Sequence, residues 1–88
     1  MIRRRVVAQG RVQGVFFRDS VRRLAQQHGV AGCVMNRWDG AVEAVFEGER
    51  DPVDRLVRFM HKGPRGAQVD RVEVLEEEPE ELRGFTVQ

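Results

Sequence analysis

The chain has only one cysteine and no tyrosine, and long hydrophobic runs are also missing. A single cysteine, Cys33, cannot form a disulfide within the chain, and a reduced thiol is typical of cytoplasmic proteins. No apolar segment approaches the roughly 20 residues that a membrane-spanning helix needs, and no hydrophobic segment follows the N-terminal arginines as it would in a secretory signal. We therefore expect a cytoplasmic protein without disulfides, a membrane span or a membrane partner.

Side chains that bind metals are scarce too. The two histidines, His28 and His61, lie in different predicted helices, and neither has a cysteine or histidine partner at ligand spacing. The sequence therefore predicts no metal site and no other cofactor.

Positive and negative charges nearly cancel, with 15 basic and 14 acidic residues and a formal net charge of +1. Domains that bind nucleic acids usually carry a clear basic excess on one face, so we expect no nucleic-acid partner. The one basic cluster, Arg3 to Arg5, is more typical of a solvated strand edge than of a binding patch. The acidic run at residues 76–81 is predicted to be a solvated connector.

The apolar pattern predicts short strands and two helices. A chain of 88 residues can bury one small core, so we predict a single domain over residues 1–88. Stretches with period two, typical of strands, alternate with stretches of helical period. Strands are expected at residues 3–9, 31–38, 41–47 and 69–75, helices at 17–28 and 52–62, and a short segment at 85–87 can return to the sheet.

Turn and cap residues mark the boundaries of these elements. Gly29 is a typical left-handed end for the first helix, and Asp39-Gly40 favours a tight hairpin between the two middle strands. Asp51 is predicted as the N-cap of the second helix and Pro52 as its first helical residue. The order strand, helix, strand, strand, helix, strand indicates an α+β protein of the ferredoxin-like, or split βαβ, class, with a mostly antiparallel sheet covered by two helices on one face.

A loop bounded by glycines, GRVQGVFFR at residues 10–18, leads from the first predicted strand into the first helix. Free backbone N–H groups, the partial positive charge of a helix N-terminus and the guanidinium of Arg18 all favour a phosphate-sized anion there. A surface salt bridge is the simpler alternative for Arg18. The loop nevertheless predicts an anion-binding site.

Asn36 is the only asparagine in the chain, and it stands in a predicted strand, where asparagine is disfavoured. Local rules of this kind are most often broken at functional sites. A neutral amide can both accept from and donate to a water without adding negative charge beside an anion. The alternative is a turn residue four positions before Gly40.

The chain resembles the acylphosphatase family over nearly its whole length, from Val6 to Val87. Four stretches carry the resemblance: residues 10–18, GCVMN at 32–36 followed by DGAVE at 39–43, Gly63-Pro64, and FTV at 85–87. Cys33 stands where the family usually has tryptophan, and Met35 stands where it usually has a basic residue. The family's chemistry depends directly on neither position.

The resemblance implies an enzyme that hydrolyses the carboxyl–phosphate bond of small-molecule acyl phosphates without a metal ion or cofactor. Within it, Arg18 binds the phosphoryl group and Asn36 orients the attacking water. The backbone of the loop lines the phosphate cradle at Arg11, Val12, Gln13, Gly14, Val15, Phe16 and Phe17. We separately expect the protein to be a monomer.

Two other functions remain open on the same scaffold, because one fold hosts many functions. One is a non-catalytic module that binds phosphate or carbamoyl phosphate, since acylphosphatase-like domains also occur within larger maturation enzymes. Saturable phosphate binding without turnover would favour it. The other is an RNA-recognition domain, which needs aromatic side chains facing out from the sheet. The third predicted strand offers only Phe46, beside Glu43 and Glu47.

Overall fold

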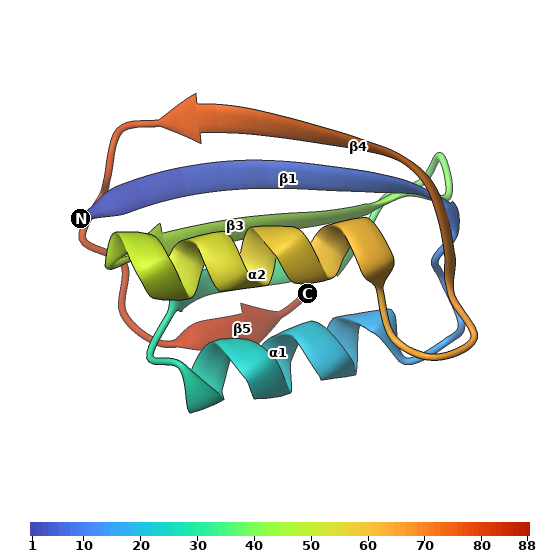
Figure 1. The fold of residues 1–88 in the computed structure, drawn as a ribbon, viewed down its shortest axis with the longest axis horizontal. Coiled ribbons are helices and arrows are strands. Elements are labelled where there is room, and N and C mark those ends of the chain that lie inside the picture. The colour runs from blue at the N-terminus through green and yellow to red at the C-terminus, as the bar shows by residue number, and fades with distance from the viewer.

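A five-stranded sheet carries both helices on one of its faces (Figure 1). The computed structural model describes all residues from 1 to 88. In chain order the elements are β1 Ile2–Arg11, α1 Phe17–Gln27, β2 Ala31–Asn36, β3 Val42–Gly48, α2 Arg50–Lys62, β4 Gln68–Glu77 and β5 Phe85–Val87.

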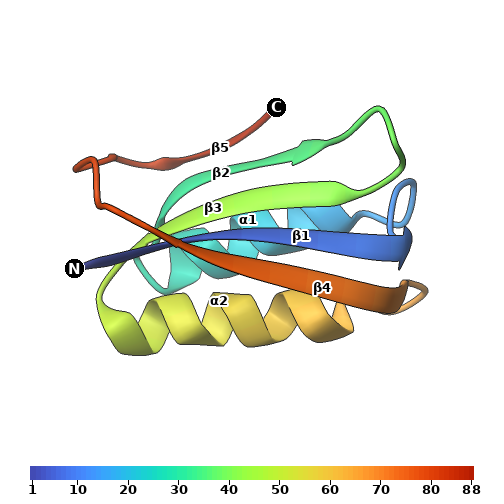
Figure 2. The same cartoon turned by 90° about the horizontal axis from the view of Figure 1, so that it is seen from above.

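The strands lie in the order β4-β1-β3-β2-β5 (Figure 2). Every neighbouring pair is antiparallel except β2 and β5, which are parallel. Helix α2 packs over β1 and β4, whereas α1 packs over β2 and β5. The predicted ferredoxin-like α+β fold is thereby confirmed, and residues 85–87 do return to the sheet, as its fifth strand.

The core fills the space between the sheet and the two helices. It consists of 15 buried side chains, ten of which are valines and alanines, and the larger ones come from both helices and from β3 and β5. Phe85 brings the short strand β5 into this core, where its ring stacks on that of Phe46 in β3 with centroids 6.0 Å apart. Burial of one such ring contributes about 1.5–3 kcal/mol, which compensates for the small number of backbone bonds that three residues can make.

The second helix begins earlier than predicted. Its N-cap is Glu49, whose backbone oxygen accepts the first helical hydrogen bond from the N–H of Val53, so Asp51 is a residue of the first turn and not the cap. Pro52 does not determine the start of the helix. Its missing N–H would lack a helical partner anywhere in the first turn, so the helix accommodates it at the third position as well as at the first.

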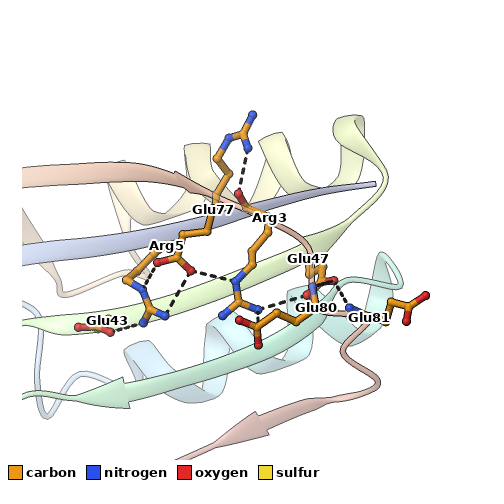
Figure 3. Close-up of polar contacts among 8 residues, drawn as sticks. Arg3, Arg5, Glu43, Glu47, Glu77, Glu80 and Glu81 are labelled. Atoms are coloured by element: carbon orange, nitrogen blue, oxygen red, sulfur yellow. Dashed lines mark hydrogen bonds and ion pairs between the residues drawn. The ribbon is translucent and has the colours of Figure 1, made fainter.

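The arginine cluster at residues 3–5 is not a solvated edge. Strand β1 lies between β4 and β3, and Arg3 is only 6% exposed. Its guanidinium binds Glu47 at 3.2 Å and Glu77 at 2.9 Å on the sheet face that the helices leave free (Figure 3). Arg5 binds the same Glu77 at 2.7 Å and also Glu43 at 2.6 Å. The prediction failed because strand order depends on long-range pairing.

The connector after β4 is tied down by the same network. Strand β4 extends to Glu77, and the buried Glu47 accepts the backbone N–H groups of Glu80 and Glu81 through one carboxylate oxygen, at 2.8 and 2.7 Å (Figure 3). Its other oxygen binds Arg3. The acidic run is thus only partly the solvated connector that its composition suggests.

Hydrogen bonds in this network also shift proton affinities. Bonds from Arg5 and then Arg3 hold the pKa of Glu77 at about 2, below its ordinary value of 4.5. The bond to Glu77 is in turn the main cause that raises the pKa values of Arg3 and Arg5. All three side chains therefore remain charged over the whole neutral range.

Glu47→Ala tests whether the buried pair is essential to the fold. The substitution removes a carboxylate that is 1% exposed and leaves Arg3 and two backbone N–H groups without it. We expect the free energy of unfolding in urea to fall by about 3–5 kcal/mol. Glu76→Ala, which removes an exposed carboxylate paired with Arg4, is the control, and its loss should be several times smaller. Equal losses would contradict this account.

Glu77→Gln tests the pH dependence of stability. Because the pKa of Glu77 is about 2 when folded and near 4.5 when unfolded, its contribution is complete above about pH 5 and is lost as the pH falls toward 2. We expect the variant to be less stable at neutral pH and to lose less stability between pH 5 and pH 2. Urea midpoints across that range measure the effect. Glu73→Gln, an exposed position of β4 without an ion pair, should keep the wild-type slope.

Candidate functional site

A cavity of about 480 Å³ lies where the loop between β1 and α1 meets the ends of β2 and β5. Both predicted site residues with functional side chains, Arg18 and Asn36, line it. The loop contributes part of its predicted set, and two charged residues of α1 and one residue of β5 join them. The lining residues are Val12, Gly14, Phe16, Phe17, Arg18, Asp19, Arg22, Asn36 and Val87.

The loop presents free backbone donors. Gly14 and Phe16 both have left-handed backbones, with φ of 76° and 60°, and Val15 between them does not. An alternation of this kind turns successive N–H groups toward one side, as in the anion-binding nests of other proteins. None of the N–H groups of residues 12–16 donates a hydrogen bond within the chain. Their bonding capacity is available to an anion.

Contacts on the far side of the loop hold it in place. The side-chain amide of Gln13 donates to the backbone oxygens of Arg37 and Ala41, at 2.8 and 3.0 Å, and so ties the loop to the turn between β2 and β3. Gly10 marks a bulge against β4, where a Cβ would lie 2.2 Å from the backbone oxygen of Gln68. Of the predicted loop residues, Arg11, Gln13 and Val15 lie outside the cavity lining.

Arg18 is the second residue of α1, and its guanidinium reaches across to the C-terminal segment. Its Nη1 donates to the backbone oxygen of Gln88 at 2.8 Å. No Asp or Glu side chain pairs with it, so the structure does not support the alternative of a surface salt bridge to an acidic side chain. The remaining N–H groups of its planar fork are free to bind an anion in the cavity.

Asn36 is the last residue of β2, paired with Val42 of β3, so the alternative that placed it in the turn is wrong. Its side chain is exposed and forms no hydrogen bond within the chain. The amide is therefore free to bind a water molecule or a ligand at the edge of the cavity.

Asp19 and Arg22 are cavity residues that the sequence reasoning missed. Asp19 accepts a hydrogen bond from Arg22 at 2.7 Å and pairs with Arg23 at 3.0 Å. The bond from Arg22, followed by the charges of Arg23 and Arg22, lowers the pKa of the Asp19 carboxyl. The sequence did carry a signal for this pairing, because Arg22 and Arg23 follow the acidic Asp19, in the first turn of the predicted helix, by three and four residues. The carboxylate stays ionised, and its charge is offset.

No group of three or more His, Cys, Asp or Glu side chains in the structure is arranged to hold a metal ion. Cys33 is a half-buried free thiol in β2. Neither helix is long and apolar enough to cross a membrane. Phe46, which an RNA-binding sheet would need on its outer face, is fully buried in the core.

The fold and the cavity define a ferredoxin-like α+β protein with an anion-accepting loop beside an arginine and an asparagine. The acylphosphatase family model matches residues 4–87. An acylphosphatase of Rubrobacter xylanophilus is 60% identical over 85 residues, which are 94% of this chain and 76% of that protein. The chain belongs to the acylphosphatase family, as its motifs predict, and the activity it carries is acylphosphatase activity.

Solved structures agree with this assignment. The crystal structure of acylphosphatase from Bacillus subtilis matches with a TM-score of 0.95 and 34% identity, over 100% of this chain and 99% of that one. The crystal structure of full-length HypF in the phosphate- and nucleotide-bound form matches with a TM-score of 0.87 and 29% identity, over 100% of this chain but 12% of that one.

Gly14→Ala tests the backbone geometry of the loop. An alanine at φ 76° costs about 1 kcal/mol or more and disturbs the direction of the loop N–H groups, although the Cβ would meet no atom within 4 Å. We expect weaker binding of inorganic phosphate, by about tenfold, in isothermal titration.

Gly29→Ala is the matched control, because Gly29 has φ 68° and equally open space but follows the other end of α1. It should lower the melting temperature by a similar amount and leave phosphate binding as it is. Equal phosphate affinity in the two variants would contradict the role of the loop.

Proposed function

We propose that this acylphosphatase cleaves the carboxyl–phosphate bond of small-molecule acyl phosphates by direct, in-line attack of water on phosphorus, without a metal ion. The new bond forms between the water oxygen and phosphorus, and the bond from phosphorus to the carboxyl oxygen breaks. A carboxylate and inorganic phosphate leave, and the proton of the water goes to solvent. The observation that carries the proposal is the meeting of free loop N–H groups, Arg18 and Asn36 at one cavity.

The chemistry of the substrate makes few demands on the protein. The leaving carboxylate has a conjugate acid with a pKa of about 4, so no strong general acid is needed. Phosphoryl transfer is catalysed mainly by positioning and by neutralisation of the equatorial oxygens. Backbone N–H groups and one guanidinium are suited to that task.

Arg18 has the role of binding the phosphoryl group. A guanidinium can make two parallel hydrogen bonds to phosphate oxygens, and the bond from its Nη1 to Gln88 restricts its orientation before the substrate arrives. Its position in the first turn of α1 adds the partial positive charge of the helix N-terminus. The loop N–H groups of residues 12–17 complete the cradle.

Asn36 has the role of orienting the nucleophilic water. It stands on a different element from the loop, at the end of β2, and lines the same cavity. A free neutral amide can hold a water molecule in line with the bond that breaks, without repelling the anionic substrate. We include in the proposal a single domain over residues 1–88 that works as a monomer in the cytoplasm.

Hydrolysis of acetyl phosphate by purified variants tests these roles. We expect Arg18→Ala to lower kcat/KM by about 10²–10³-fold and Asn36→Ala by about 10²-fold or more, chiefly in kcat for the asparagine. Arg18→Lys, which keeps the charge and loses the fork, should fall between wild type and Arg18→Ala.

Arg55→Ala is the control for these variants, because Arg55 is an exposed residue of α2 that forms no ion pair and does not line the cavity. It should retain nearly the wild-type rate. Full activity of Arg18→Ala or of Asn36→Ala would refute the assignment of that residue.

A non-catalytic phosphate-binding module is the second candidate. The likeness to a HypF structure, in which a matching region makes up 12% of a longer chain, supports it. The higher identity to free acylphosphatases favours the enzyme. One pair of measurements distinguishes the enzyme from the module, because the module would bind phosphate with a measurable Kd and release no carboxylate from acetyl phosphate.

A further inference from the structure

Two adjacent phenylalanines at the start of α1 have opposite environments. The side chain of Phe17 is 2% exposed and belongs to the core, where its ring meets that of Phe59 edge to face. Phe16 is 81% exposed and has a left-handed backbone, with φ 60° and ψ 27°. Only the buried ring, that of Phe17, stabilises the fold.

The residue type at position 16 is therefore unexplained by the fold. A bulky residue in the left-handed region is strained, and glycine or asparagine adopts that conformation more readily. An exposed ring also gains no burial energy. Phe16 gives no side-chain cap to the helix that it precedes. A strained and exposed aromatic residue at a functional loop indicates that a ligand covers the ring.

The position of Phe16 indicates the kind of ligand that covers its ring. Its side chain lines the cavity that Arg18 and Asn36 also line, together with the buried Val12 and the exposed Val87 of β5. A cavity of about 480 Å³ falls within the range that holds whole organic ligands, so a phosphoryl group in the cradle leaves much of it unfilled. One cavity therefore contains both polar groups that can bind the phosphoryl end of a ligand and apolar groups that can contact its other end.

We propose that Phe16 and Val87 form an apolar platform for the acyl group, so that the enzyme prefers acyl phosphates whose acyl part is apolar, and aromatic above all. The inference rests on the proposed function and extends it to the part of the substrate that is not phosphate. Stacking or edge contact with the Phe16 ring favours an aromatic acyl group over acetyl. The contact is made in the ground state and in the transition state alike, so it lowers KM more than it raises kcat.

The experiment compares two substrates within each variant. The measured quantity is the ratio of kcat/KM for benzoyl phosphate to kcat/KM for acetyl phosphate, because the phosphoryl chemistry is common to both. Phe16→Asn suits the left-handed backbone and removes the apolar ring. We expect the ratio to fall about tenfold, mainly through KM for benzoyl phosphate. Phe16→Leu keeps an apolar side chain under the same strain and should retain more of the ratio than Phe16→Asn, and Val87→Ser should lower it in the same direction.

Trp38 provides the matched control. It is the other strongly exposed aromatic residue, at 95%, but it lies in the turn between β2 and β3 and does not line the cavity. Trp38→Asn should keep the wild-type ratio. An unchanged ratio in Phe16→Asn, or an equal fall in Trp38→Asn, would overturn the inference. If Arg18→Ala meanwhile loses turnover of both substrates, the proposed function stands without the platform.

Discussion

The buried ion pair between Arg3 and Glu47 is the contact on which the arrangement of the C-terminal third depends. Glu47 binds Arg3 with one oxygen and the backbone at residues 80–81 with the other, so it ties the connector to β3. From that point the chain runs directly into β5, and the backbone after β5 holds Arg18 through Gln88. An isolated buried pair repays its desolvation poorly. Here the extra backbone bonds satisfy the carboxylate, and they make the pair a means of positioning and not only of stability.

The loop between β1 and α1 contrasts with the Glu47 carboxylate, whose hydrogen bonds are satisfied. The backbone of this loop is strained, and its N–H donors have no partners. Its N–H groups lack partners within the chain, and Phe16 has a left-handed backbone. Such conformations persist only where the surroundings determine them. The surroundings here are the side chain of Gln13, bonded to the neighbouring turn, and the fully buried Val12. Rigid contacts behind the loop thus maintain an anion-accepting surface in front of it.

Local patterns predicted most of the fold and the centre of the candidate site, because both are encoded by neighbours in sequence. Period and turn residues identified every element, and glycine spacing with Arg18 identified the loop. The wrong prediction for the arginine cluster depends on long-range pairing. The central place of β1, and with it the burial of Arg3, follows from strand order, which no local period reports. Asp19 and Arg22 line the cavity because of the direction in which α1 runs, which the sequence does not report. The start of α2 was wrong for a local reason, because Pro52 fits more than one position in a first helical turn.

The charges at the cavity explain why an activated substrate suits the proposed mechanism. Asp19 is the only carboxylate among the lining residues, and Arg22 and Arg23 lower its pKa, so at neutral pH it holds no proton to donate to a leaving group. A site of this kind can release only a group that departs as a stable anion. A carboxylate does so, whereas an alkoxide from an ordinary phosphate ester does not. The same pairing prevents Asp19 from repelling the phosphoryl group, since its negative charge is offset by two arginines. The proposed preference for the anhydride thus rests on the lack of a protonated carboxyl group among the lining residues as well as on what Arg18 and the loop supply.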